Sequence, residues 1–245
     1  MVKNVLFFLA KIPHGGAGGV KPPRLPPQPE SGIIMTAQLY CFGESGNAYK
    51  AALAMTFADM AWEPVFVDFF NGETRTPAFR ALNEMGEVPV LVDGDTTLSQ
   101  SAVILDYVSS KTGKLGGRSA AERREVLRWM FWDNHKLSGL AGTARFLSNF
   151  LPEDKRPAGV VPFLQGRLKT AYTLLNDHLA TRAWVAGAQM TIADLSCCGY
   201  LYYPEPFGFR RADWPHVDAW LARISAQPGW KHPYDMMPGN PSDRA

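Results

Sequence analysis

The stretch VPVLVDGDTTLSQSAVILDY, residues 88–107, combines a hairpin pattern with the start of a helix. Two apolar runs flank Asp93-Gly94, and an Asp-Gly pair in this setting is the strongest short-range signal for a β-hairpin turn. A helix is expected directly afterwards, with Ser99 as its cap, because serine favours the position before a helix. The stretch therefore predicts an antiparallel strand pair that leads straight into a helix.

Upstream of this stretch, strand and helix patterns alternate. Short apolar runs at 37–42 and 62–69 predict strands, and apolar residues at helical spacing predict a helix over 46–59. A short helix is expected to start near Pro77 and to be closed by Gly86. The order β-α-β-α-β-β-α within about 80 residues predicts a mixed sheet with helices on both faces.

Downstream of the stretch no convincing strand pattern appears. Residues 111–119, KTGKLGGRS, are typical of a linker. Helical patterns follow at 120–151, 160–180, 191–203 and 215–226, with Val126, Met130 and Leu137 as expected core residues of the first. We therefore expect an α/β domain over 35–112 and an all-α domain over 119–238. Residues 1–34, which are dense in Gly and Pro, are expected to be a disordered or non-native extension.

Composition narrows the classes of function. The chain has 46% hydrophobic and 20% charged residues and a net charge of +2. It therefore has neither the excess of basic residues typical of nucleic-acid-binding proteins nor an acidic tail. Its three cysteines form no CxxC pair and no metal-ligand spacing, which indicates a reducing compartment and a cytoplasmic location. The apolar run Val5 to Ala10 is too short to span a bilayer. We expect no nucleic-acid partner, no membrane partner and no metal.

Three local patterns carry candidate chemistry. Ser45 lies at the start of the helix over 46–59, where it either caps the helix or presents its hydroxyl to a bound thiol. Pro89 starts a strand, and a cis bond there would expose the backbone of Val88, although a trans edge proline is the commoner case. Gln100 and Ser101 lie at a helix start, where free N–H groups suit a carboxylate, although ordinary capping also explains the serine.

A fourth pattern is structural. Thr191 and Asp194 have the spacing of a capping box, which serves folding of a buried helix and carries no catalysis. Together, four segments in this order and spacing resemble the cytosolic glutathione S-transferase superfamily, in its bacterial and fungal serine-type members, over residues 36 to about 235. They are NEMGEVPVL (83–91), LSQSAVILDYV (98–108), WVAGAQMTIADLS (184–196) and WPHVDAWLARISAQPGW (214–230).

The resemblance implies a thioredoxin-like N-terminal domain, an all-helical C-terminal domain and glutathione as cosubstrate. Under it, Pro89 is a cis proline and the Val88 backbone pairs with the cysteinyl part of glutathione. Gln100 and Ser101 hold its γ-glutamyl group. Ser45 stabilises the thiolate as the catalytic residue, and Asn47 contacts the thiol or its backbone.

Two features of this chain depart from the family pattern, and two residues compete with Ser45 for the catalytic role. Glu87 stands where the family usually has a basic residue near the glycyl carboxylate, and Arg75 or Arg80 could substitute for it. The residues that bind the acceptor have no clear family match. Tyr40 is a rival hydroxyl, whereas Cys41 is expected to be a small buried filler within its strand.

The resulting hypothesis is a homodimeric transferase that joins the thiolate to an electrophilic apolar small molecule, with a role in detoxification. The candidate acceptor pocket lies between the domains, with Trp132, His135 and Tyr202 as walls, although aromatic stripes at helical spacing more often form core. Two alternatives stay open. They are a glutathione-dependent disulfide or peroxide reductase, and a non-catalytic scaffold that kept the fold.

Overall fold

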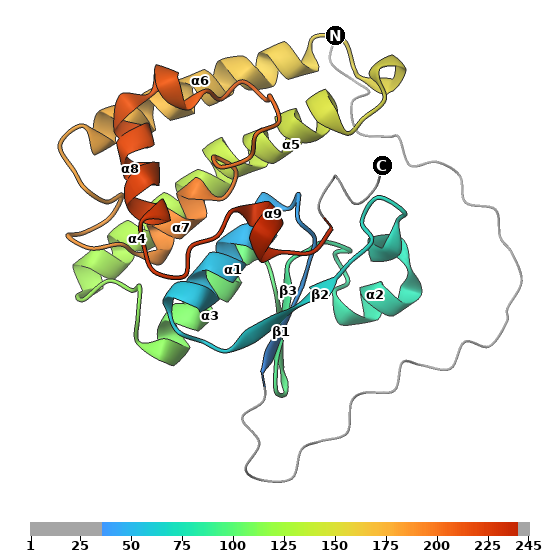
Figure 1. Cartoon of the computed structure of the whole chain (residues 1–245), viewed down its shortest axis with the longest axis horizontal. Helices are drawn as coiled ribbons and strands as arrows, with labels where there is room; N and C mark the ends of the chain where they lie inside the picture. Colours follow the sequence, from blue (N-terminus) through green and yellow to red (C-terminus); the bar gives the residue numbers. More distant parts are fainter. Residues whose placement is uncertain (1–35, 240–245) are drawn as a thin grey trace, which may run out of the picture. The chain divides into compact units, whose positions relative to one another are not determined.

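A computed structural model describes residues 36–239 of the chain (Figure 1). The extension expected over 1–34 lies outside these residues. The described part belongs to one compact unit, built from a sheet with its helices and a larger set of helices. The boundaries at 112 and 119 between the two expected domains stay a prediction.

The sheet has four strands in the order β2-β1-β3-β4. The strands are β1 (Ala37–Cys41), β2 (Trp62–Phe66), β3 (Val90–Asp93) and β4 (Thr96–Ser99). β1 runs parallel to β2 and antiparallel to β3, and β3 pairs antiparallel with β4. The predicted hairpin is confirmed, because Asp93 pairs with Thr96 across a turn in which Gly94 has a φ of 60°.

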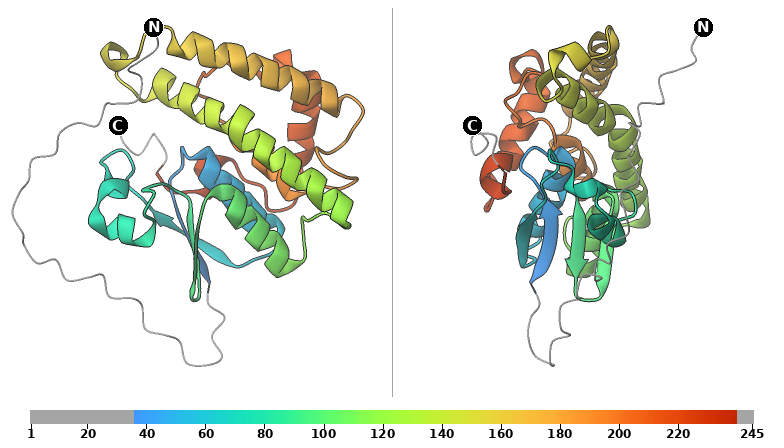
Figure 2. Two further views of the ribbon diagram at one scale, coloured as in Figure 1. Left: turned by 180° about the vertical axis from the view of Figure 1, so that it is seen from behind. Right: turned by 90° about the vertical axis from the view of Figure 1, so that its right-hand side faces the viewer.

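Helices cover both faces of this sheet, as predicted. Leu39 of β1 pairs with Leu91 of β3, and both side chains enter the core formed with the helices α1 (Gly46–Phe57) and α3 (Ser101–Thr112). The neighbouring pair, Tyr40 and Val90, faces the opposite way and packs with Phe79 of α2 (Pro77–Leu82). This alternation follows from the two-residue period of a strand. Figure 2 shows α2 apart from the α1 and α3 pair.

The start of α3 differs from the prediction. Ser99 still pairs with Val90 in the sheet, so the helix begins only at Ser101. The residue before the helix is Gln100, which has a φ of 68° and makes no side-chain cap to the backbone. Ser99 is therefore the last residue of β4 and not the cap. Pairing with β3 keeps Ser99 extended, so the helix starts one residue later than the local pattern indicates.

The second half of the described chain is helical. Its helices are α4 (Ala120–Trp132), α5 (Ser138–Asn149), α6 (Val160–Leu179), α7 (Ile192–Cys198), α8 (Pro215–Ser225) and α9 (Pro233–Met236). Figure 1 shows α4 and α5 following one another and α6 running alongside α5. A π-helical turn, Asp133–Leu137, separates α4 from α5, so the long helix expected over 120–151 is interrupted. Val126, Met130 and Leu137 are buried, as predicted.

The capping box before α7 is confirmed. The Thr191 hydroxyl accepts the Ala193 N–H, and Asp194 accepts the Thr191 N–H at 2.8 Å. Asp194 is fully buried and also accepts from the Val185 N–H and the Trp220 Nε1–H. Its role is to join α7 to the loop before it and to α8, which agrees with the structural role predicted for this motif.

Candidate functional site

The first turn of α1 presents Ser45 to a cavity. Ser45 is 7% exposed, and its Oγ accepts the Ala48 N–H at 3.2 Å, so the residue does cap the helix. A hydroxyl that accepts one hydrogen bond still has its own hydrogen to donate. Capping and stabilisation of a thiolate are therefore compatible roles for the same side chain.

Gly46 allows a close approach at this turn. A Cβ at Gly46 would lie 2.6 Å from Tyr200 Cδ1, so the Tyr200 ring packs against the helix start only because the residue is glycine. Tyr200 lines the same cavity as Ser45. The ring therefore forms part of the wall beside the hydroxyl.

The two rivals of Ser45 lie elsewhere. Tyr40 packs against Val90 and Phe79 on the face of the sheet that α2 covers, and it lines neither of the two cavities described below. Cys41 is buried on the α1 face, and burial raises the pKa of its thiol to about 12. A thiol with such a pKa is neutral and unreactive at pH 7, which suits a small core residue.

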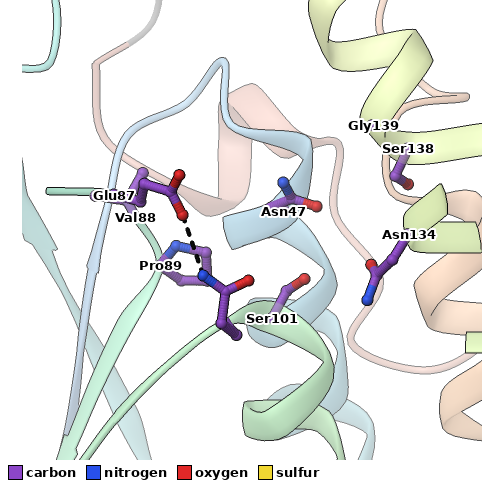
Figure 3. Close-up of a pocket in the computed structure, with 9 residues that line it drawn as sticks. Asn47, Glu87, Val88, Pro89, Ser101, Asn134, Ser138 and Gly139 are labelled. Carbon is purple, nitrogen blue, oxygen red and sulfur yellow. Dashed lines mark hydrogen bonds between the residues drawn. The ribbon is translucent and has the colours of Figure 1, made fainter. Parts of the chain in front are cut away.

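A cavity of about 190 Å³ lies between the starts of α1 and α3 and the turn before α5. The Val88–Pro89 bond is cis, and both residues line this cavity with Asn47, Gln100 and Ser101. Five of the six residues predicted to bind or activate glutathione therefore meet here, and the sixth, Ser45, lines the adjoining cavity with Asn47 and Val88. Figure 3 shows Asn47 and Ser101 pointing into the same space.

The opposite wall comes from residues that the sequence did not indicate. Asn134 in the π-helical turn, and Ser138 and Gly139 at the start of α5, complete the cavity (Figure 3). π-helical turns occur often at functional sites. The local sequence there resembles an ordinary helix, so no signal short of the folded structure identifies these three residues.

Glu87 brings a negative charge to both cavities. Its carboxylate accepts a hydrogen bond from Gln100 Nε2 at 3.1 Å (Figure 3). Arg75 and Arg80, considered as substitutes for a basic residue here, line neither cavity. Arg145 of α5 is the residue lining these cavities that carries a positive charge.

The second cavity, of about 430 Å³, has a largely aromatic wall. The rings contact one another in a row, with distances measured between centroids. Phe42 stacks on Phe69 at 4.8 Å, Phe69 meets Phe70 edge-on at 5.3 Å, and Phe70 lies tilted against Phe150 at 5.4 Å. Phe146 adds a further ring from α5. Residues of both the sheet-containing half and the helical half line this cavity.

The three residues named as walls of that pocket are not brought to it. Trp132 packs edge-on against Trp129 at 5.0 Å, and His135 is exposed on the π-helical turn. Tyr202 is buried and donates its hydroxyl to the Leu221 carbonyl at 2.7 Å. None of the three lines either cavity. The rings that do line the larger cavity come mostly from the segment after β2 and from α5.

Two further properties concern residues 36–239 only. No group of three or more His, Cys, Asp or Glu side chains in that range is placed to hold a metal ion. No helix in the same range is long and apolar enough to cross a bilayer.

Comparison with known families agrees with the geometry. Residues 35–110 match the family described as the N-terminal domain of glutathione S-transferase, and residues 143–228 match its C-terminal domain. The chain therefore belongs to the glutathione S-transferase family. The thioredoxin-like and helical architecture inferred from the sequence is that of this family.

Relatives and solved structures support the same assignment. The chain is 31% identical over 206 residues to glutathione S-transferase 3 of Zea mays, covering 79% of this chain and 91% of that protein. It is 26% identical over 198 residues to the disulfide-bond oxidoreductase YfcG of Escherichia coli, covering 76% and 89%.

Among solved structures, a possible glutathione S-transferase from Rhodopseudomonas palustris superposes with a TM-score of 0.75 at 33% identity, covering 81% of this chain and 98% of that one. A glutathione transferase from Burkholderia graminis, solved with two glutathione molecules per subunit, gives a TM-score of 0.72 at 25% identity, covering 79% and 85%.

Proposed function

We propose that the protein is a glutathione transferase that binds glutathione in the smaller cavity and activates its thiol with the Ser45 hydroxyl. The observation that carries the proposal is the meeting of Asn47, Val88, Gln100 and Ser101 around one cavity, with Ser45 at its border. Val88 and Gln100 come from distant segments, and only the fold brings them to α1. Solved members of the family carry glutathione, and a relative bears the transferase name.

Each residue has a distinct role in the proposal. The Val88 backbone, beside the cis bond, pairs with the cysteinyl unit of glutathione, and Pro89 shapes that turn. Gln100 and Ser101, at the N-terminus of α3, hold the γ-glutamyl carboxylate, where unpaired N–H groups and the helix dipole favour an anion. Asn47 lies in the first turn of α1, between the two cavities, and contacts the cysteinyl unit.

The energetic requirement matches what this turn can supply. A free thiol has a pKa of about 8.5, so lowering it by two units requires roughly 2.7 kcal/mol of preferential stabilisation of the thiolate. A hydrogen bond from a hydroxyl to a charged group contributes roughly 1.5–3 kcal/mol. The positive end of α1 adds roughly 0.3–1 kcal/mol. One serine at the helix start is therefore sufficient in magnitude.

The larger cavity is the proposed acceptor site. It borders Ser45, so an electrophile held against the Phe42, Phe69 and Phe150 rings would lie next to the sulfur. An aromatic wall favours an apolar acceptor. The thiolate forms a bond to the electrophilic carbon of that acceptor. Where that carbon carries a halide, the carbon–halogen bond breaks and the halide leaves as an anion; where it belongs to an activated double bond, the π electron pair moves onto the conjugated group, which then takes a proton from water. In both cases the product is a thioether of glutathione. Reduction of a disulfide would use the same thiolate, and the relationship to YfcG makes this the second candidate.

The proposal extends to a homodimer in the cytoplasm with a detoxifying role. Val103 in α3 and Phe131 in α4 are large apolar side chains left exposed on the monomer, which is compatible with a second copy covering them. The molar mass in solution, measured by light scattering, tests the dimer.

Glutathione binding, followed by calorimetry, tests the proposed site. Ser101→Ala should weaken binding about tenfold, because a charge-assisted hydrogen bond worth roughly 1.5 kcal/mol is lost. Ser225→Ala is the matched control, since Ser225 is half-buried, donates its hydroxyl to the Ala222 carbonyl of its own helix and lines neither cavity. Product analysis with an aromatic halide and with a disulfide separates the two candidate reactions. Failure of the unmodified protein to bind glutathione would contradict the proposal and favour a scaffold.

A further inference from the structure

The turn that leads into Ser45 is held by groups from distant parts of the chain. Gly43 donates its N–H to the Pro238 carbonyl at 2.6 Å. The Gly43 carbonyl accepts the Tyr203 hydroxyl at 2.6 Å. The next carbonyl, that of Glu44, accepts Nη1 of Arg145 at 2.7 Å. Two consecutive carbonyls before Ser45 are thus fixed by side chains of the helical half.

Arg145 is built into this position rigidly. It is 2% exposed, and its Nε and Nη2 donate to one Glu205 oxygen at 3.1 and 2.7 Å. Nη2 also donates to the Tyr234 hydroxyl at 2.7 Å, and Tyr234 donates in turn to the other Glu205 oxygen. The guanidinium carbon lies 3.8 Å from the centroid of the Tyr203 ring. A planar fork with this many partners keeps one orientation.

Stabilisation of the fold by the Arg145–Glu205 ion pair does not by itself account for this arrangement. A buried ion pair is weak evidence for stabilisation, because desolvation of both charges offsets their attraction. Arg145 lines the larger cavity next to Ser45, so the positive member of the Arg145–Glu205 pair lies at the wall of the proposed reaction site. The network connects α5, the segment after α7 and α9 to one turn of the thioredoxin-like half.

We propose that Arg145 and Tyr203 are positioning residues for the Ser45 hydroxyl, and that the pKa of the bound thiol therefore depends on the helical half of the protein. The inference rests on the proposed function. By fixing the Gly43 and Glu44 carbonyls, the two side chains set where Ser45 Oγ points relative to the sulfur. Neither residue contacts the sulfur in this account. A displacement of about 1 Å is enough to lower a catalytic rate by roughly a hundredfold, so anchoring of this turn has a large effect.

The test is the ultraviolet absorbance of glutathione thiolate bound to the full chain, recorded against pH. Tyr203→Phe removes only the hydroxyl that fixes Gly43 and keeps the ring under Arg145. Arg145→Met removes the anchor of Glu44. Arg223→Met is the matched control, because Arg223 also donates to a carbonyl, that of Ala183, and lies over a Trp184 ring, but lines neither cavity.

Both Tyr203→Phe and Arg145→Met should raise the pKa of the bound thiol, by roughly one unit for Arg145→Met, which is a tenfold lower thiolate-to-thiol ratio. Arg223→Met should leave that pKa unchanged. Affinity for S-methylglutathione, which has no thiol to ionise, should stay within about fivefold in all three variants, because one hydrogen bond to a neutral ligand contributes about 1 kcal/mol, which is about fivefold in affinity. A merely structural role would change affinity and stability together and leave the pKa where it is.

The outcomes separate this inference from the proposed function. An unchanged thiol pKa in folded Arg145→Met and Tyr203→Phe, with a lowered pKa in the unmodified protein, overturns the inference and leaves the transferase proposal intact. If Arg145→Met does not fold, Tyr203→Phe alone decides between these results. A free-solution thiol pKa in the unmodified protein overturns both proposals.

Discussion

A buried ion pair joins the two halves of the protein, and Asp133→Ala should lower the free energy of unfolding by about 3–5 kcal/mol. Lys50 of α1 donates to Asp133 of the π-helical turn at 2.6 Å, and both side chains are 0% exposed. Asp133 also accepts the Ser138 hydroxyl at 2.7 Å and the Ser196 hydroxyl at 2.6 Å. The carboxylate is therefore the common acceptor of one ammonium and two hydroxyl groups.

The magnitude follows from what the substitution leaves behind. Removing the carboxylate strands a buried ammonium and two buried hydroxyl groups, and each stranded neutral group costs roughly 1–3 kcal/mol. Replacing both charges, as in Lys50→Met with Asp133→Leu, removes the uncompensated ammonium and should cost less than Asp133→Ala alone. Asp59→Asn is the control, because the ion pair of Asp59 with Lys114, also at 2.6 Å, is exposed and contributes at most about 1 kcal/mol. Asparagine is used because Asp59 has a φ of 55°, which asparagine tolerates better than alanine.

Urea unfolding followed by circular dichroism measures all three effects. We expect the loss of stability to be largest for Asp133→Ala, smaller for the double variant and smallest for Asp59→Asn. A loss of stability below about 1 kcal/mol for Asp133→Ala would refute this expectation, because leaving a buried charge unpaired costs more than that. A double variant less stable than Asp133→Ala would refute it as well.

Three further predictions concern single residues. Burial raises the pKa of Asp194 to about 6, above its unfolded value, so the stabilising effect of Asp194 is greatest at low pH and is lost as the pH rises through roughly 4 to 6. In urea unfolding, the stability of the unmodified protein relative to Asp194→Asn should therefore fall by about 2 kcal/mol between pH 4.5 and 7. A difference that does not depend on pH would contradict this. Phe150→Ala should lower kcat/KM for an aromatic acceptor by roughly two- to tenfold, since a ring contact contributes about 0.5–1.5 kcal/mol, with little change for a small aliphatic acceptor. Equal losses for both acceptors would exclude an aromatic subsite. Glu87→Gln keeps an acceptor for Gln100 but removes a negative charge. Glutathione should therefore bind a few-fold more tightly at low salt, measured by calorimetry, and this gain in affinity should shrink with added salt. Unchanged affinity at low salt would show that Glu87 does not face the glycyl carboxylate.

Elements with strong local signals could be predicted from the sequence. The hairpin at Asp93-Gly94 and the capping box at Thr191 depend on residues a few positions apart, and both are present. The end of β2 could not be predicted, because the apolar run continues to 69 whereas pairing with β1 ends where Cys41 meets Phe66. The length of an edge strand is set by its neighbour, which the local pattern does not contain.

The candidate site likewise contains residues that the sequence could predict and residues that it could not. Gln100, Ser101 and Pro89 lie in short motifs that the sequence displays, and the structure brings them to one cavity. Asn134 and Phe150 could not be found, because their place on a cavity wall depends on how α4, α5 and the sheet pack. The aromatic spacing that suggested Trp132 as a wall instead reflects packing against Trp129.

The most direct measurement of the central claim is the thiolate absorbance of glutathione bound to the unmodified protein and to Ser45→Ala. We expect the pKa of the bound thiol to lie about two units below the free value of about 8.5 in the unmodified protein, and to return to within about half a unit of that value in Ser45→Ala. Loss of the Ala48 cap should also cost about 1 kcal/mol of stability, which urea unfolding checks separately. Equal thiolate fractions in the folded variant and the unmodified protein at pH 7 would contradict the assignment of Ser45.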